Sequence, residues 1–198
     1  MTEKIDLFKL HKAEYASPKK PAIVSAGKGK YLSVAGKGGP GGEEFQSKVG
    51  SLYAAAYTLK FASKEKGKDF AVCKLEGVFS GGAALADLPP EAWEWRLMIR
   101  MPDFIKPADL RVATEKLREK GKCPDVEELE FVDLAEGKCV QMLHVGPYTE
   151  EAETIQQMLA FAADEGLAPR GDHHEIYLSD PRRVEPARLK TILRQPVG

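Results

Sequence analysis

A short stretch near the C-terminal end, D-H-H-E-I-Y-L-S-D at residues 172–180, combines side chains that could do chemistry. Glycine and proline residues bound it on both sides, which is typical of a short strand. Because side chains alternate along a strand, we expect Glu175 and Tyr177 to share one face and Ile176 and Leu178 to share the other. The aliphatic face can then be core while the carboxylate lies at a site.

Glu175 and Tyr177 are the candidate catalytic residues. A glutamate in an apolar, aromatic groove can attract an organic cation. With a pKa raised by desolvation, it can instead act as a general base toward water. Tyr177 could donate a hydrogen bond to a ligand carbonyl. The alternatives are a solvated surface glutamate and an exposed strand tyrosine that covers apolar surface.

Two motifs, one typical of a metal site and one of a cofactor site, lack the geometry that such a site requires. His173 and His174 are neighbours in a strand and point oppositely, so they cannot chelate one ion in regular geometry. Residues 36–41 formally read G-x-G-x-x-G, but Pro40 interrupts the turn and two glutamates open the following helix, which would repel a pyrophosphate. We therefore predict no metal and no cofactor.

Composition indicates an ordinary soluble protein. The 198 residues are 43% hydrophobic and 30% charged, with a net charge of -1, which does not suggest a nucleic-acid binder. Three cysteines, Cys73, Cys123 and Cys139, form no C-x-x-C pair, which favours reduced thiols. No signal peptide or membrane span is evident, so we expect a cytoplasmic protein.

The first half of the chain predicts the elements that would hold the site. Residues 1–20 are charged and predict a loosely attached arm with a turn or two of helix. Two apolar runs flank glycines at 27–29, as in a hairpin. Spacings of three and four predict a helix from Glu43 to near Gly67. Strands at 70–77 and 93–102 and a helix that starts at Pro107 and ends at Gly121 complete this half.

The second half follows the same order. Apolar runs on both sides of residues 136–137 predict another hairpin. The motif G-P-Y-T-E-E then opens a helix, with Thr149 as candidate N-cap and Gly166 at its end. The strand at 172–180 comes next, and the chain finishes with L-K-T-I-L-R-Q-P-V.

Matching motifs indicate an internal duplication. G-P-G-G-E-E at residues 39–44 matches G-P-Y-T-E-E at 146–151, and L-M-I-R-M-P matches T-I-L-R-Q-P. The predicted fold is therefore α+β, with a duplicated strand-helix-strand-strand repeat, antiparallel sheets with helices on one face, and a ligand groove between pseudo-twofold halves. We divide the chain into the 1–20 arm and a single domain, 21–198, whose repeats span about 21–122 and 123–198.

The repeat also suggests residues around the ligand. Glu76 is expected to face the same side as Glu175, unless the turn at Gly77 points it to solvent. Trp95 matches a pocket-lining position in the other repeat, and Trp93 shares its strand face, although large aromatics are more often core. The last two candidates for ligand binding, Phe79 and Tyr148, are expected in loops at the ends of the groove.

The motifs G-P-Y-T-E-E-A, H-H-E-I-Y-L-S-D-P-R-R and L-K-T-I-L-R-Q-P-V resemble the GyrI-like small-molecule-binding family. The chain is most similar to the stand-alone subgroup in which A-Y-T-L-K-F, L-E-G and M-I-R-M-P-D-F also occur. The resemblance implies a ligand groove between the repeats, and Glu175 matches a glutamate at the bottom of an aromatic pocket in multidrug-sensing relatives. Residues 75–80 read L-E-G-V-F-S where the subgroup usually has L-E-G-L-W-W, which removes stacking area.

The resemblance implies three hypotheses for function. Some stand-alone members are hydrolases that open the ring of cyclopropanoid compounds; here Glu175 would deprotonate the attacking water and Tyr177 would stabilise the developing phenolate. The second hypothesis is a multidrug-binding or sensing module without turnover. The third is inhibition through protein contact, as in gyrase-inhibitory relatives. The first two predict a small hydrophobic or aromatic ligand, and no nucleic acid or membrane.

Overall fold

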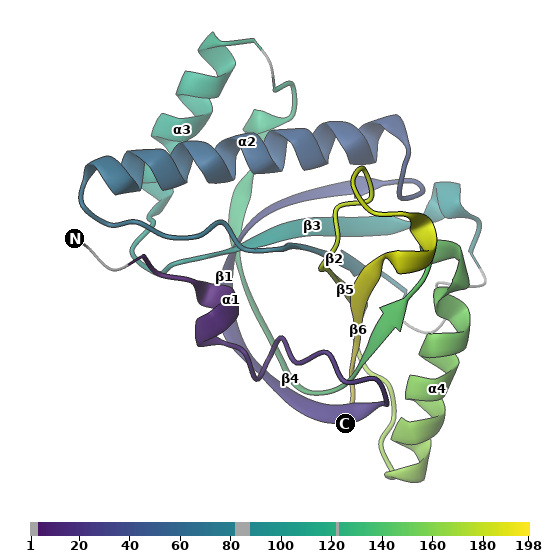
Figure 1. Ribbon diagram of the computed structural model, residues 1–198. Helices are drawn as coiled ribbons and strands as arrows, with labels where there is room; N and C mark the ends of the chain where they lie inside the picture. Colours follow the sequence, from purple (N-terminus) through teal and green to yellow (C-terminus); the bar gives the residue numbers. More distant parts are fainter. Residues whose placement is uncertain (1–3, 82–87, 122) are drawn as a thin grey trace. The chain divides into compact units, whose positions relative to one another are not determined.

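The chain folds as an α+β protein with antiparallel sheet pairing, as predicted (Figure 1). The computed structural model describes residues 4–81, 88–121 and 123–198. In chain order the elements are α1 (Leu7–Leu10), β1 (Ala22–Lys37), α2 (Glu43–Glu65), β2 (Leu75–Phe79), η2 (Pro90–Ala92), β3 (Glu94–Met101), α3 (Pro107–Glu119), η3 (Val126–Glu128), β4 (Glu130–Val145), η4 (Tyr148–Glu150), α4 (Glu151–Asp164), β5 (His173–Tyr177), η5 (Pro186–Arg188) and β6 (Lys190–Pro196).

The chain divides into two compact units that do not follow the order of the sequence. Of the described residues, unit 1 comprises those in 4–10, 29–73 and 90–134, and unit 2 comprises those in 11–28, 74–81, 88–89 and 135–198. Strands β1 and β4 each contribute residues to both units. Each unit therefore depends on segments that are far apart in the sequence.

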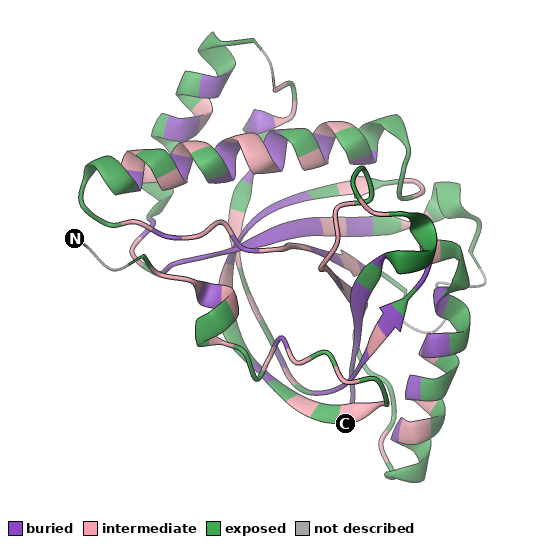
Figure 2. Ribbon diagram, viewed as in Figure 1, coloured by how far each residue is buried: buried purple, intermediate pink, exposed green. Residues whose placement is uncertain are grey.

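Unit 1 is built on antiparallel pairing of β1 with β3, from Lys30 opposite Met101 to Lys37 opposite Glu94. Helix α2 packs on β3, where the Phe45 and Trp95 rings meet edge to face with centroids 5.0 Å apart. Helix α3 lies beside α2 (Figure 1). Buried and exposed residues alternate along α2, so one stripe of the helix faces the core (Figure 2).

Unit 2 contains the strand predicted to carry the site. Its strands are ordered β2-β5-β6-β4, and β5 pairs antiparallel with β2 on one side and β6 on the other. Helix α4 packs on one face of these strands, where Met158 and Ala162 join a buried cluster with Val140 and Leu193. Strand β5 is central in this order, so its side chains have neighbours on both sides.

Both predicted hairpins are wrong. Residues 22–37 and 130–145 are each a single strand of 16 residues. Gly27 and Gly29 do not adopt the positive φ that a two-residue hairpin turn requires, and the chain runs straight on. Gly137 does have a positive φ, 71°, but it lies within β4, so the chain does not reverse there.

Helix α2 starts at Glu43 and α3 at Pro107, as predicted. Thr149 is not the N-cap of α4, because one turn of 3-10 helix intervenes and Glu150 takes that position. Strand β2 starts at Leu75, later than expected.

The N-terminal segment is not loosely held around Tyr15, which is only 5% exposed and hydrogen-bonded within unit 2. Cys73, Cys123 and Cys139 are free thiols, as predicted. No helix in the described part of the chain is long and apolar enough to cross a membrane.

Candidate functional site

Strand β5 presents different chemistry on its two faces. Pairing places His173, Glu175 and Tyr177 on one face and His174 and Ile176 on the other. Ile176 is fully buried, which confirms that the aliphatic side is core. The adjacent histidines point to opposite faces, as predicted, and each has a glutamate near it.

Glu175 lies in a mostly enclosed position. Its side chain is 13% exposed, and Oε2 accepts a hydrogen bond of 2.7 Å from the Tyr177 hydroxyl. His173 Nε2 lies 3.6 Å from Oε1 of the same carboxylate. Glu175 is therefore not a solvated surface glutamate, and its orientation is fixed by Tyr177.

A second carboxyl group, that of Glu151, lies against Glu175. Glu151 is the first residue of α4 and is 6% exposed. Burial, the negative charge of Glu175 and a hydrogen bond with it together raise the pKa of Glu151 far above the usual range of a carboxylic acid. At neutral pH Glu151 is then a neutral acid that lies against the carboxyl group of Glu175.

Aromatic rings surround this pair. The Tyr148 and Tyr177 rings meet edge to face with centroids 5.8 Å apart. Phe79 pairs with His173 and Gly77 pairs with Glu175, so the Phe79 ring lies on the same face as the two carboxyl groups.

The phenols around the pair are held neutral. Burial and nearby carboxylates raise the pKa of Tyr148 to about 12 and that of Tyr177 well above its ordinary value. Both hydroxyls keep their protons at neutral pH and can act as donors.

The other face of β5 carries a buried ionic network. His174 lies between two glutamates, with Nδ1 2.9 Å from Glu136 and Nε2 3.0 Å from Glu76. Arg194 donates to Glu136 at 2.7 Å, and the Tyr15 hydroxyl donates to Glu76 at 2.7 Å. Two carboxylates thus face two cations, and every member of the network comes from unit 2.

The network fixes its own protonation. Burial opposes the charged imidazole, but Glu136 and Glu76 outweigh it and raise the pKa of His174 to about 9. Burial likewise opposes the Glu136 carboxylate, but His174 and Arg194 lower its pKa to about 2. At neutral pH the Glu136 carboxylate therefore lies between two positive charges, those of His174 and Arg194, so these buried charges are paired.

The structure brings together some of the predicted site residues and separates others. Glu175, Tyr177, Phe79 and Tyr148 form one cluster, although Phe79 belongs to strand β2 rather than a loop. Glu76 is fully buried opposite Ile176, so the expectation that it shares the face of Glu175 is wrong. The reason is the register of β2, which places Gly77 opposite Glu175.

Neither tryptophan lies in the part of the chain that holds this cluster. Trp95 is 2% exposed in unit 1, and its Nε1 donates to the Gly38 carbonyl at 2.8 Å. Trp93 is partly buried in the same unit, just before β3. Trp95 is therefore part of the core of unit 1 rather than of a ligand pocket, as is usual for a large aromatic residue.

Sequence reasoning missed Glu151. The motif G-P-Y-T-E-E served only as evidence for the repeat, yet its last glutamate, as the first residue of α4, is the one that turns inward. A glutamate at the start of a helix is usually explained by the helix dipole, and this explanation hides a buried acid. Among the described residues, no three His, Cys, Asp or Glu side chains are grouped to hold a metal ion.

Comparisons with known proteins identify a family and similar structures. A family model described as the GyrI-like small-molecule-binding domain matches residues 30–197. No curated protein sequence matches the chain.

Solved structures from Listeria innocua are similar over nearly the whole chain. One is described as a hydrolase, with 41% identity, a TM-score of 0.88 and coverage of 98% of this chain and 100% of that one. Another, described as an uncharacterized conserved protein, has 42% identity and a TM-score of 0.90, with the same coverage. The C-terminal domain of EcmrR, at 11% identity and a TM-score of 0.61 over 90% of this chain and 97% of that one, is similar in fold alone.

Proposed function

Because the chain belongs to the GyrI-like small-molecule-binding family, we propose that it binds hydrophobic or aromatic small molecules beside Glu175 and hydrolyses the cyclopropane ring of electrophilic cyclopropanoids. The observation that carries this proposal is the buried pair of carboxyl groups, in which a neutral Glu151 lies against Glu175 and the Tyr177 hydroxyl holds Glu175 at 2.7 Å. In this proposal Glu151 serves as the acid and Glu175 as the base of one reaction. We also propose that the ligand lies in a groove between two duplicated halves of the chain.

The proposed reaction uses both groups once in each turnover. Glu175 accepts a proton from a water molecule whose oxygen bonds to a ring carbon, and the strained carbon–carbon bond breaks. The electron pair of the broken bond moves into the conjugated carbonyl system, which becomes a phenolate. The phenolate then accepts the proton of Glu151. The proton now on Glu175 then returns to Glu151 through the hydrogen bond between them, which restores the starting state.

Tyr177 has a different role from the one predicted for it. Its hydroxyl donates to Glu175, so we propose that it holds the base in position rather than stabilising the phenolate. The rings of Phe79 and Tyr148 would hold a flat ligand through stacking and edge contacts. The resemblance to a Listeria innocua structure described as a hydrolase supports turnover.

The test is incubation of the pure protein with a cyclopropanoid, with the product followed by mass spectrometry. The expected product is the compound plus one water. Glu175→Gln and Glu151→Gln should each lower the rate by about 10²-fold or more, since each removes one of the two proton-transfer groups. The matched control is Glu153→Gln, because Glu153 is an exposed glutamate in the same helix and its substitution should leave the rate unchanged.

The second candidate, binding without turnover, is distinguished in the same experiment. It predicts saturable binding of the compound that weakens in Glu175→Gln, while the compound is recovered intact. Recovery of the intact compound from the wild-type protein at all times would reject hydrolysis. Absence of saturable binding as well would reject a small-molecule site at Glu175.

A further inference from the structure

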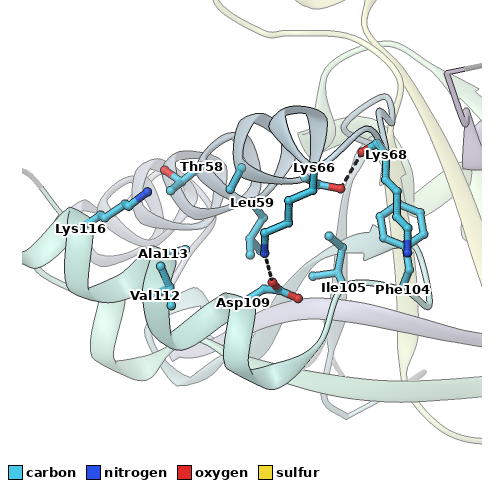
Figure 3. Close-up of a pocket in the computed structure, with 12 residues that line it drawn as sticks. Thr58, Leu59, Lys66, Lys68, Phe104, Ile105, Asp109, Val112, Ala113 and Lys116 are labelled. Carbon is cyan, nitrogen blue, oxygen red and sulfur yellow. Dashed lines mark hydrogen bonds and ion pairs between the residues drawn. The ribbon is translucent and has the colours of Figure 1, made fainter. Parts of the chain in front are cut away.

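A groove of about 420 Å³ lies between α2 and α3 in unit 1 (Figure 3). The walls come from the second half of α2, the residues that follow it, the loop before α3, and one side of α3. Its volume falls within the range of small-molecule sites, about 300–1,000 Å³. None of its lining residues belongs to the carboxyl pair or to unit 2.

The floor of the groove is apolar. Leu59, Ile105 and Ala113 are almost completely buried beneath it, with 1%, 2% and 3% exposure. Phe104 lies at one end, and Val112, on α3, is 50% exposed at the edge. A ligand in this groove would remove apolar surface from water chiefly at Val112, since the floor residues are already buried.

The rim of the groove is basic. Lys66, Lys68 and Lys116 line it, against a single carboxylate, Asp109. Asp109 lies 3.0 Å from Lys66 and also accepts a hydrogen bond from the backbone of Lys106 at the start of α3. Its charge is therefore committed to Lys66, so the groove keeps the positive charges of Lys68 and Lys116.

Lys68 and Lys116 enter the groove from different sides. Lys68 follows α2 and holds its ammonium 5.4 Å from the centroid of the Phe104 ring, while Lys116 lies on α3 near the other end of the groove (Figure 3). A cation held over a ring beside an apolar floor suits a ligand that carries both an aromatic part and an anionic group.

We propose that this groove binds a small amphipathic anion, with an aromatic or aliphatic body on the floor and a sulfonate, carboxylate or phosphate that is attracted by the positive charges of Lys68 and Lys116 at the two ends of the groove. This site is separate from the one proposed at Glu175, and its ligand has the opposite charge to an organic cation. We assign a small molecule rather than a partner protein because the volume of the groove is that of a small-molecule site.

The probe is 1-anilinonaphthalene-8-sulfonate, whose fluorescence increases when its rings leave water. We expect saturable binding that weakens by about fivefold in Lys68→Glu and in Lys116→Glu, since each reverses one charge at a partly screened distance. The control is Lys64→Glu, an exposed lysine of α2 that does not line the groove and should leave the affinity unchanged. Ala62→Phe should abolish binding because its ring would fill the space above the floor.

Three further measurements keep the result specific. Shifts of the Ile105 and Ala113 methyl signals in NMR spectra should saturate together with the fluorescence, which places the probe in the groove. N-phenyl-1-naphthylamine, which has the same rings without the sulfonate, should bind equally to the wild type and both lysine variants. Glu175→Gln should not alter the affinity for the sulfonate. Circular dichroism checks that each variant is folded.

Two outcomes would overturn the proposal. One is equal weakening in Lys64→Glu and Lys116→Glu, which would reduce the effect to net charge. The other is methyl shifts confined to unit 2, which would place the probe elsewhere.

Discussion

Glu175 owes its chemical character to its contacts. Tyr177 fixes the carboxylate at 2.7 Å, and Glu151 supplies a neutral acid beside it. A strand glutamate without these neighbours would be an ordinary solvated base. The buried acid destabilises the fold at neutral pH, since a carboxyl group that would ionise in the unfolded chain is kept neutral in the folded one.

We therefore expect Glu151→Gln to stabilise the protein while it lowers the rate of the proposed hydrolysis. The folded-state pKa of Glu151 lies above its unfolded value of 4.5, so its contribution to stability falls as pH rises above that value. An amide avoids this loss and can still donate to Glu175. Urea denaturation at pH 8 should show a gain of roughly 2 kcal/mol that vanishes near pH 4. The control, Glu153→Gln, should change neither the stability nor the rate of hydrolysis. A loss of stability in Glu151→Gln at pH 8 would contradict a buried neutral acid at this position.

Tyr177→Phe tests the positioning role. The variant keeps the ring that contacts Tyr148 but loses the donor to Glu175. We expect ligand affinity within about twofold of wild type and a hydrolysis rate lowered about tenfold, comparable to the loss of one hydrogen bond to a charged group. Steady-state kinetics separates the two effects. A large rise in KM with unchanged kcat would instead indicate direct contact with the ligand.

The strands and helices place these residues through register and close packing. In unit 1, β1 approaches β3 at Gly36, where a Cβ atom would lie 2.2 Å from the Trp95 ring. That contact explains why a glycine is needed inside a strand. It also explains why Trp95 serves the core rather than a ligand.

We predict that Gly36→Ala destabilises the protein by about 1–3 kcal/mol, since the Trp95 ring must move from its packed position. Gly50, in the middle of α2, has open space around its Cα, so Gly50→Ala should be neutral or stabilise by up to about 1 kcal/mol. Thermal denaturation of the two variants compares the same chemical change at two sites. Equal effects would show that Trp95 has room to adjust.

The molecule as a whole should respond to pH through the network on the other face of β5. The pKa of His174 rises from 6.5 to about 9 on folding, so the stability it contributes is complete below pH 6.5 and lost as pH rises through 9. The pKa of Glu136 falls from 4.5 to about 2, so its contribution is present above pH 4.5 and lost as pH falls through 2. The network should stabilise the protein most between pH 4.5 and 6.5.

His174→Gln tests this profile. The difference in unfolding free energy between wild type and variant should be on the order of 3 kcal/mol at pH 6 and should shrink above pH 9, since the imidazole is then neutral in both states. His11→Gln is the control, because His11 lies on the surface segment near Glu14 at 37% side-chain exposure. A difference that stays constant from pH 6 to pH 10 would mean that His174 is not charged in the folded protein.

The alternation of β5 and the starts of α2 and α3 could be predicted because each depends on local sequence: a period of two, a period near 3.6, and a proline at a helix start. Whether the chain forms hairpins at residues 22–37 and 130–145 could not be predicted, because a glycine between apolar runs is compatible with a turn, a bulge or a straight strand. Distant pairing partners decide among these. The aromatic residues near Glu175 were only partly predictable. Tyr148 and Phe79 were identified as candidates, but both were expected in loops, whereas Tyr148 lies in η4 and Phe79 in β2.

By itself, the sequence determined the α+β class, the family, and the face of β5 that carries Glu175 and Tyr177. Only the tertiary structure decided that Glu151 is the partner of Glu175 and that Glu76 belongs with His174 instead. The physical reason is that strand periodicity sets the direction of a side chain, whereas protonation and partnership depend on which groups from remote segments share its low-dielectric surroundings.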